Sequence, residues 1–142
     1  MRLKDIPGHE TIKHNLLKMV HSGRIPHGLF FIGPSGCGHL PLAVAMATYI
    51  SCTQRTDDES CGKCRSCVKI DKLIHPDLHF VFPTAGTDKS GERILSVSLM
   101  VKWREFFLKN NYFNVQDWLG FTDSDNRQGS ISVDESRELI RK

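Results

Sequence analysis

The chain contains no apolar run that approaches the roughly 20 residues of a membrane-spanning helix. Its first residues, Met1-Arg2-Leu3-Lys4-Asp5-Ile6-Pro7, lack the apolar stretch of a secretory signal peptide. Internal repeats and low-complexity segments are also absent. These absences argue against membrane, secreted and fibrous classes, and we expect a cytoplasmic protein with no membrane partner.

Recognisable catalytic constellations are missing as well. No Ser-His-Asp or Cys-His arrangement has a usable spacing, so we assign no catalytic residue. The net charge of +3 is too small to indicate nucleic-acid binding by itself. With 142 residues, 39% hydrophobic and 25% charged, the composition is ordinary for one globular domain that spans residues 1–142.

A glycine-rich turn is the most informative segment that is present. It follows the apolar run 29–32, precedes a helix-like stretch and reads Gly33-Pro34-Ser35-Gly36-Cys37-Gly38-His39-Leu40. This is the setting of a phosphate-binding loop, whose pattern is G-x-x-x-x-G-K-[ST]. Gly33 and Gly38 keep the glycine spacing, but His39 replaces the lysine and Leu40 offers no oxygen to Mg²⁺. The segment therefore predicts a degenerate loop that retains weak affinity for anions and for which ATP is not expected as a cofactor.

Four cysteines within sixteen residues indicate a metal site. They are Cys52, Cys61, Cys64 and Cys67, and together they form a Cx8CxxCxxC pattern. In a chain without export signals, this spacing favours metal binding over disulfides, and four thiolates suit one structural Zn²⁺. An iron–sulfur cluster is the competing interpretation, but Asp71 occupies the position where a ferredoxin-type run has its fourth cysteine. The fifth cysteine, Cys37, is interpreted as a small loop residue.

Hydrophobic periodicity predicts an α/β layout. The wholly apolar run 29–32 is typical of a strand buried on both faces of a parallel sheet, and 78–82 is predicted as a second strand. Helices are predicted over 10–21, 41–51, 64–74, 98–109 and 114–120. A last helix is predicted to run from a capping box at Ser132 and Glu135 to the C-terminus. Residues 83–91 and 122–129 are predicted as loops.

Several segments, taken in order, resemble the N-terminal part of bacterial DNA polymerase III clamp-loader subunits of the delta-prime and gamma/tau group. The matching segments are Ile6-Pro7-Gly8-His9-Glu10, Gly23-Arg24-Ile25-Pro26-His27, the loop 33–40, the four-cysteine module, His75-Pro76-Asp77-Leu78 and Ile131-Ser132-Val133-Asp134-Glu135-Ser136-Arg137-Glu138-Leu139. The replaced lysine and hydroxyl residues point to delta-prime rather than to the ATP-hydrolysing gamma/tau subunit.

The resemblance implies a fold and a function. The implied fold is an AAA+-like P-loop NTPase, a three-layer α/β arrangement around a parallel sheet. Here it would be incomplete and carry the zinc module 52–67 as an inserted knuckle. The implied function is non-catalytic: a structural part of the ring that loads the sliding clamp on primed DNA. Its partners would be other clamp-loader subunits and, through the complex, the clamp and DNA.

Residues 83–130 depart from the family pattern, and we interpret them as an inserted helical segment. The family also implies further elements after Lys142, so the chain is expected to be a fragment. Two other functions stay open: an active gamma/tau-like P-loop ATPase with an unusual loop, and a zinc-dependent nucleic-acid-binding module. The aromatic-rich stretch 103–118, with basic residues beside it, could stack bases, but it fits the core of a small helical subdomain better.

Overall fold

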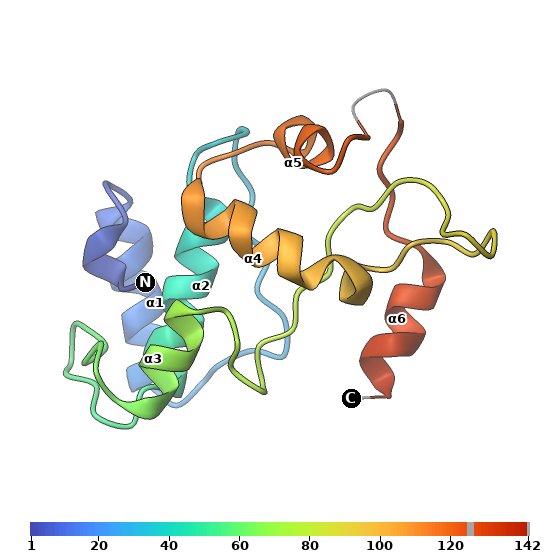
Figure 1. Ribbon diagram of the computed structural model, residues 1–142. Helices are drawn as coiled ribbons and strands as arrows, with labels where there is room; N and C mark the ends of the chain where they lie inside the picture. Colours follow the sequence, from blue (N-terminus) through green and yellow to red (C-terminus); the bar gives the residue numbers. More distant parts are fainter. Residues whose placement is uncertain (125–126, 142) are drawn as a thin grey trace. The chain divides into compact units, whose positions relative to one another are not determined.

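The computed structural model describes residues 1–124 and 127–141, and these form two compact units, Met1–Leu78 and His79–Lys142. Residues 125 and 126, in the predicted loop 122–129, and Lys142, at the end of the last predicted helix, lie outside the described residues. Figure 1 traces the chain, and each unit is described by itself.

The first unit is organised around one apolar helix. It contains the short 3-10 helix η1 (Leu3–Asp5) and the helices α1 (Glu10–His21), α2 (His39–Ser51) and α3 (Arg65–Asp71). Helix α2 buries seven of its residues, so apolar side chains cover most of its circumference, as expected of a central helix. Helices η1 and α3 both pack against it. The core of this unit consists of Leu3, Ile6, Leu16, Val20, Leu42, Ala45, Met46 and Tyr49.

The second unit is held together by aromatic rings. Its elements are η2 (Ser96–Leu99), α4 (Met100–Lys109), α5 (Val115–Phe121) and α6 (Val133–Ile140). The Trp103 ring stacks on Phe82 with centroids 4.3 Å apart and meets Trp118 edge-on at 5.0 Å. Both tryptophans and Phe107 are at most 3% exposed. The interpretation of this stretch as a subdomain core is therefore confirmed, because rings buried in this way cannot stack bases.

The predicted parallel sheet is wrong for the described residues. They contain helices and loops but no strand, and their only β-type pairings are two isolated antiparallel bridges, Thr84 with Ser130 and Thr87 with Arg93. A P-loop NTPase sheet is therefore not observed. A strand requires a neighbour that completes its hydrogen-bond ladder, and apolar sequence alone does not supply one.

Among residues 1–124 and 127–141, neither predicted strand segment has a neighbouring strand that completes a hydrogen-bond ladder. The segment 29–32 has no helical or ladder hydrogen bonds among the described residues, and it leaves Phe30 89% and Ile32 80% exposed. In the segment 78–82, the Phe82 N–H donates to the Ser96 hydroxyl at 3.1 Å, so a side chain occupies a group that a ladder would use.

The predicted helices are confirmed: α1 has the predicted ends, and the ends of the others differ. Helix α3 is shorter than the predicted 64–74 because Leu73 adopts a left-handed backbone with φ 53°. Helix α4 begins at Met100, after the 3-10 turn η2. Asn114 caps α5 and accepts the Asp117 N–H at 3.0 Å. No helix in the described part of the chain is both long and apolar enough to cross a membrane.

The predicted capping box at Ser132 and Glu135 is wrong. Ser132 precedes α6 but makes no side-chain cap hydrogen bond, and its buried hydroxyl has no partner among the described residues. Glu135 turns instead to Ser96, where it accepts both the backbone N–H and the hydroxyl. The buried hydrogen bonds of Glu135 with Ser96 thus replace the predicted capping contact with Ser132.

Candidate functional site

The four predicted cysteine ligands converge. The sulfur atoms of Cys52, Cys61, Cys64 and Cys67 all lie within 4.8 Å of one another, and no disulfide joins them. Cys52 terminates α2, and Cys64 occupies the N-cap of α3, with Cys67 one turn further on. Two helix ends therefore carry three of the ligands.

The spacing of the sulfurs fits a tetrahedral ion. Four sulfurs at about 2.3 Å from one Zn²⁺ are separated from each other by about 3.8 Å. Three of the six separations are 3.5 Å for Cys64–Cys67, 3.9 Å for Cys52–Cys64 and 4.0 Å for Cys61–Cys67, and no pair is more than 4.8 Å apart. Together with the all-sulfur donor set, this geometry shows that the cluster could hold one metal ion.

Backbone N–H groups favour thiolates at this cluster. Cys52 accepts the Cys61 N–H, and Cys61 accepts the Cys64 N–H, both at 3.3 Å. The Cys67 N–H, followed by groups of Thr53, lowers the pKa of Cys64 to about 5. Burial, in contrast, raises the pKa of Cys67 to about 12. The hydrogen bonds therefore favour the thiolate form of Cys64, whereas burial favours the thiol form of Cys67, and a metal ion that binds Cys67 displaces its proton.

Glu59, which the motif analysis missed, links the cysteine loop to the start of the chain. One carboxylate oxygen accepts the Leu3 N–H at 3.2 Å, and the other accepts the Lys4 N–H at 2.8 Å. The N-terminal ammonium group of Met1 also forms an ion pair with Asp71 of α3. Hydrogen bonds from the N-terminal segment to Glu59 therefore connect that segment to the module 52–67. The only sequence signal for this pairing was the proximity of Glu59 to the cysteines.

The glycine-rich turn leads directly into α2. Gly36 and Gly38 have φ values of 77° and 90°, a region that side-chain-bearing residues rarely adopt. Gly38 is the N-cap of α2, and His39 is its first residue. Because Pro41 has no N–H and Leu42 donates to Gly38, the first turn offers only the N–H groups of His39 and Leu40 to an anion.

The side chains of Cys37, His39 and His9 pack inside or against the same turn. A Cβ atom placed on Gly33 would lie 2.3 Å from the Cys37 sulfur, so the thiol fills the space beside this glycine. The Cys37 sulfur lies 3.3 Å from His39 Nδ1, and the Cys37 carbonyl lies 2.7 Å from His9 Nε2. His9, which lies outside the glycine-rich turn in the sequence, is thus part of the loop structure. A cavity of about 180 Å³ lies alongside, lined in part by Phe31 and Leu42.

Residues 8–142 match the model of the family described as DNA polymerase III, delta subunit. The chain belongs to this family. The resemblance found in the sequence is thereby confirmed, because the match covers nearly all of the chain.

Individual relatives are subunits of the same polymerase. The chain is 35% identical to the delta-prime subunit of Bacillus subtilis over 77 residues and 32% identical to that of Escherichia coli over 76 residues. Each match covers 54% of this chain and 23% of the relative. It is also 35% identical to the gamma/tau subunit of Mycobacterium tuberculosis over 66 residues, which cover 46% of this chain and 11% of that protein. The chain thus spans less than a quarter of these relatives, and no solved structure matches it.

Proposed function

We propose that the chain is part of a non-catalytic, delta-prime-like clamp-loader subunit of DNA polymerase III. It would serve as a structural component of the assembly that loads the sliding clamp on primed DNA. The observation that carries the proposal is the family match over residues 8–142, combined with the loss of the catalytic pair at His39 and Leu40. Its direct partners would be other clamp-loader subunits, with the clamp and DNA reached through the complex.

The loop geometry supports the non-catalytic part of this proposal. A phosphate-binding loop uses converging backbone N–H groups, a lysine for the terminal phosphates and a hydroxyl for Mg²⁺. Here Leu40 has no hydroxyl for Mg²⁺, Pro41 has no N–H, and the Cys37 thiol fills space inside the turn. We therefore expect the turn, residues 33–40, to bind inorganic anions weakly and to leave ATP intact.

The cysteine cluster supports a structural role for a metal. One Zn²⁺ held by Cys52, Cys61, Cys64 and Cys67 would join the end of α2 to the start of α3. Through Glu59, it would also secure the N-terminal segment. The ion would thus rigidify a knuckle within the domain 1–142, with 83–130 as a separate inserted segment.

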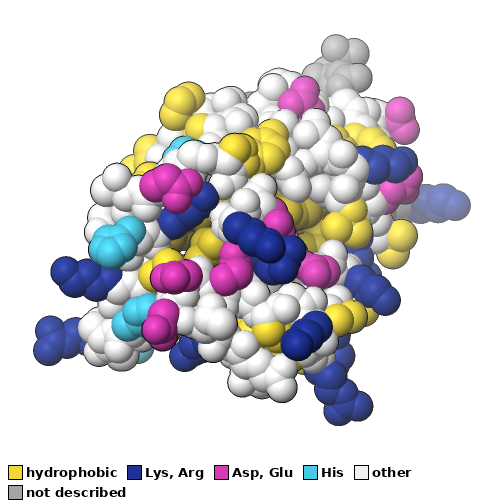
Figure 2. Space-filling view, turned by 90° about the vertical axis from the view of Figure 1, so that its left-hand side faces the viewer, with side chains coloured by type: hydrophobic (Ala, Val, Ile, Leu, Met, Phe, Trp, Pro, Cys, Tyr) yellow, Lys and Arg dark blue, Asp and Glu magenta, His cyan; other side chains and the backbone are white. Residues whose placement is uncertain are grey.

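The charge pattern on one face of the molecule gives no support to the nucleic-acid-binding alternative. On the face drawn in Figure 2, Lys and Arg side chains of the described residues are interspersed with Asp and Glu. A protein that binds nucleic acid directly usually presents a basic stripe or patch. Contact with DNA through partner subunits requires no such patch on this chain.

The test is association with purified subunits from the same organism. We expect the zinc-loaded chain to co-elute with the gamma/tau subunit in size-exclusion chromatography and to release no phosphate from Mg²⁺-ATP. Failure to associate would contradict the clamp-loader assignment. Phosphate release by the chain alone would favour the active-ATPase alternative, and salt-dependent binding of DNA by the chain alone would favour the nucleic-acid module.

A further inference from the structure

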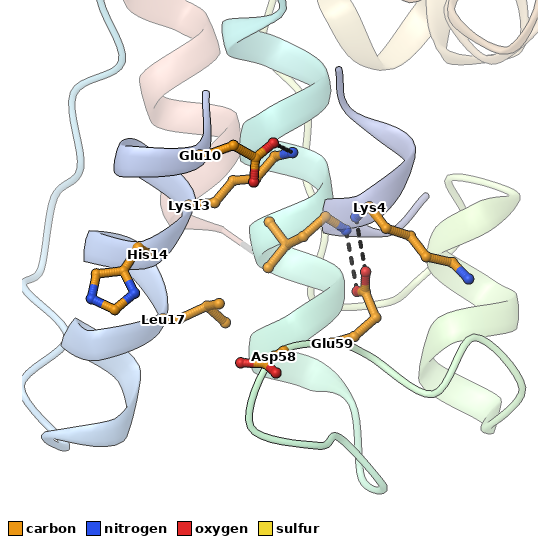
Figure 3. Close-up of a pocket in the computed structure, with 8 residues that line it drawn as sticks. Lys4, Glu10, Lys13, His14, Leu17, Asp58 and Glu59 are labelled. Atoms are coloured by element: carbon orange, nitrogen blue, oxygen red, sulfur yellow. Dashed lines mark hydrogen bonds and ion pairs between the residues drawn. The ribbon is translucent and has the colours of Figure 1, made fainter. Parts of the chain in front are cut away.

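A second cavity, away from the cysteine sulfurs and the glycine-rich turn, lies in the first unit. It has a volume of about 380 Å³ and opens between η1, α1 and the loop before Cys61. Figure 3 shows Leu17 of α1 directed toward the loop residue Asp58, with His14 and the Glu10–Lys13 pair on the α1 side. Leu3 of η1 also lines the pocket. The pocket therefore combines an apolar surface with a charged rim.

Two of the charged groups in the pocket are already satisfied. Lys13 is 8% exposed, and its ammonium group donates to the Ile6 carbonyl at 2.6 Å and to Glu10 at 3.0 Å. Both oxygens of Glu59 accept backbone N–H groups, as described above. These groups build the walls of the pocket and leave little hydrogen-bonding capacity for a ligand.

The Asp58 carboxylate, unlike the charged groups of Lys13 and Glu59, is free to bind a ligand. Within the described part of the chain, its carboxylate makes no hydrogen bond or ion pair, and Figure 3 shows the Lys4 ammonium group directed away from it. Lys13 is paired with Glu10, and the remaining charged lining residues Lys4, Asp58 and Glu59 together leave a net charge of −1 when His14 is neutral. The pocket is therefore complementary to a cation that carries an apolar stem.

We propose that this pocket binds an arginine side chain presented by a partner protein. The methylene stem would lie on the half-buried Leu17, beside the buried Leu3, and the guanidinium group would donate to the Asp58 carboxylate. Long basic side chains bury their stems along apolar surfaces while the charged head stays at the polar rim. Arginine fits better than lysine because its planar group pairs with a carboxylate through two parallel hydrogen bonds and is more weakly hydrated.

The proposal is independent of the clamp-loader assignment, because it rests only on the walls of this pocket. It can be tested with a small probe, Nα-acetyl-arginine-methylamide, added to the isotope-labelled, zinc-loaded chain at low ionic strength. Nα-acetyl-norleucine-methylamide is the neutral control, with a similar stem and no charge. Binding is measured by NMR from the methyl signals of Leu3 and Leu17 and the amide of Asp58.

The arginine probe should produce saturable shifts and bind about threefold more tightly than norleucine, as expected of an exposed ion pair. Asp58→Asn should abolish this difference. Asp57→Asn makes the same charge change one residue away, outside the pocket lining, and should preserve the difference. Equal binding of both probes, equal effects of the two variants, or shifts that do not saturate would each overturn the proposal.

Discussion

Glu135 of α6 accepts two hydrogen bonds from Ser96, one from the backbone N–H at 2.5 Å and one from the hydroxyl at 2.8 Å. The same hydroxyl accepts the Phe82 N–H at 3.1 Å. Glu135 is only 3% exposed and Ser96 1%. This buried connection joins three segments of the second unit that are far apart in the sequence.

Glu135→Ala should therefore destabilise the second unit by about 2 kcal/mol, because it leaves the buried Ser96 N–H without an acceptor. Urea denaturation followed by tryptophan fluorescence measures this selectively, since both tryptophans, Trp103 and Trp118, belong to that unit. Glu138→Ala on the same helix is the control, because Glu138 is partly exposed and should change stability by less than about 0.5 kcal/mol. Equal effects of the two variants would contradict the importance of the Ser96 contact.

The cysteine cluster should yield about one zinc per purified chain by elemental analysis. Cys64→Ser should remove most of the metal and unfold the residues around the cluster, because the ion supplies local folding energy. Cys37→Ser is the matched control and should retain the metal, since Cys37 lies outside the cluster. A fully folded protein without metal, or the visible absorption of an iron–sulfur cluster, would exclude the zinc assignment.

Metal removal should loosen the N-terminal segment through Glu59. We expect the amide hydrogens of Leu3 and Lys4 to exchange faster with solvent after chelation, because the carboxylate that accepts them is then held less firmly. Glu59→Gln should accelerate the same two amides even in the zinc-loaded protein. Amides in the middle of α4 serve as the internal reference. Unchanged exchange at residues 3 and 4 in both experiments would show that the two elements are not coupled.

The chain should release no phosphate from ATP above background. The double variant His39→Lys with Leu40→Thr restores the loop pattern and should strengthen nucleotide binding, measured by calorimetry, without restoring turnover. Cys37→Ala separately tests whether the thiol beside Gly33 obstructs the turn. Micromolar ATP affinity of the unaltered chain would show that the replaced residues matter less than we infer.

Tyr49 should make stability depend on pH in the alkaline range. Burial raises the pKa of Tyr49 above its ordinary value of 10.0, and its one hydroxyl hydrogen lies within reach of the Thr56 and Asp57 carbonyl oxygens. Above pH 10 the unfolded chain ionises first, so the free energy of unfolding should fall as pH rises through this range. Tyr49→Phe should lower stability at pH 8 by about 1 kcal/mol and flatten the fall above pH 10. An identical alkaline slope in the variant would contradict this origin.

Local patterns predicted the helices because a helix forms its hydrogen bonds within its own segment. Helices α1 and α5, predicted over 10–21 and 114–120, are examples. The convergence of the cysteines was predictable for a similar reason, since three of the four lie within seven residues. The prediction of strands was wrong because a strand depends on hydrogen bonds with another segment of the chain, which the local sequence does not show. The contacts of Glu59 with residues 55 and 56 positions away, and of Glu135 with Ser96, were equally inaccessible to local patterns.

The segment 29–32, which belongs to no helix or strand, has a practical consequence for handling the protein. Phe30 and Ile32 project almost fully into solvent beside backbone groups that have no hydrogen-bond partner among the described residues. Exposed apolar side chains beside backbone groups without hydrogen-bond partners favour pairing with another copy of the chain. The purified protein should therefore self-associate as its concentration rises. The single substitution Phe30→Lys should be enough to keep it monodisperse.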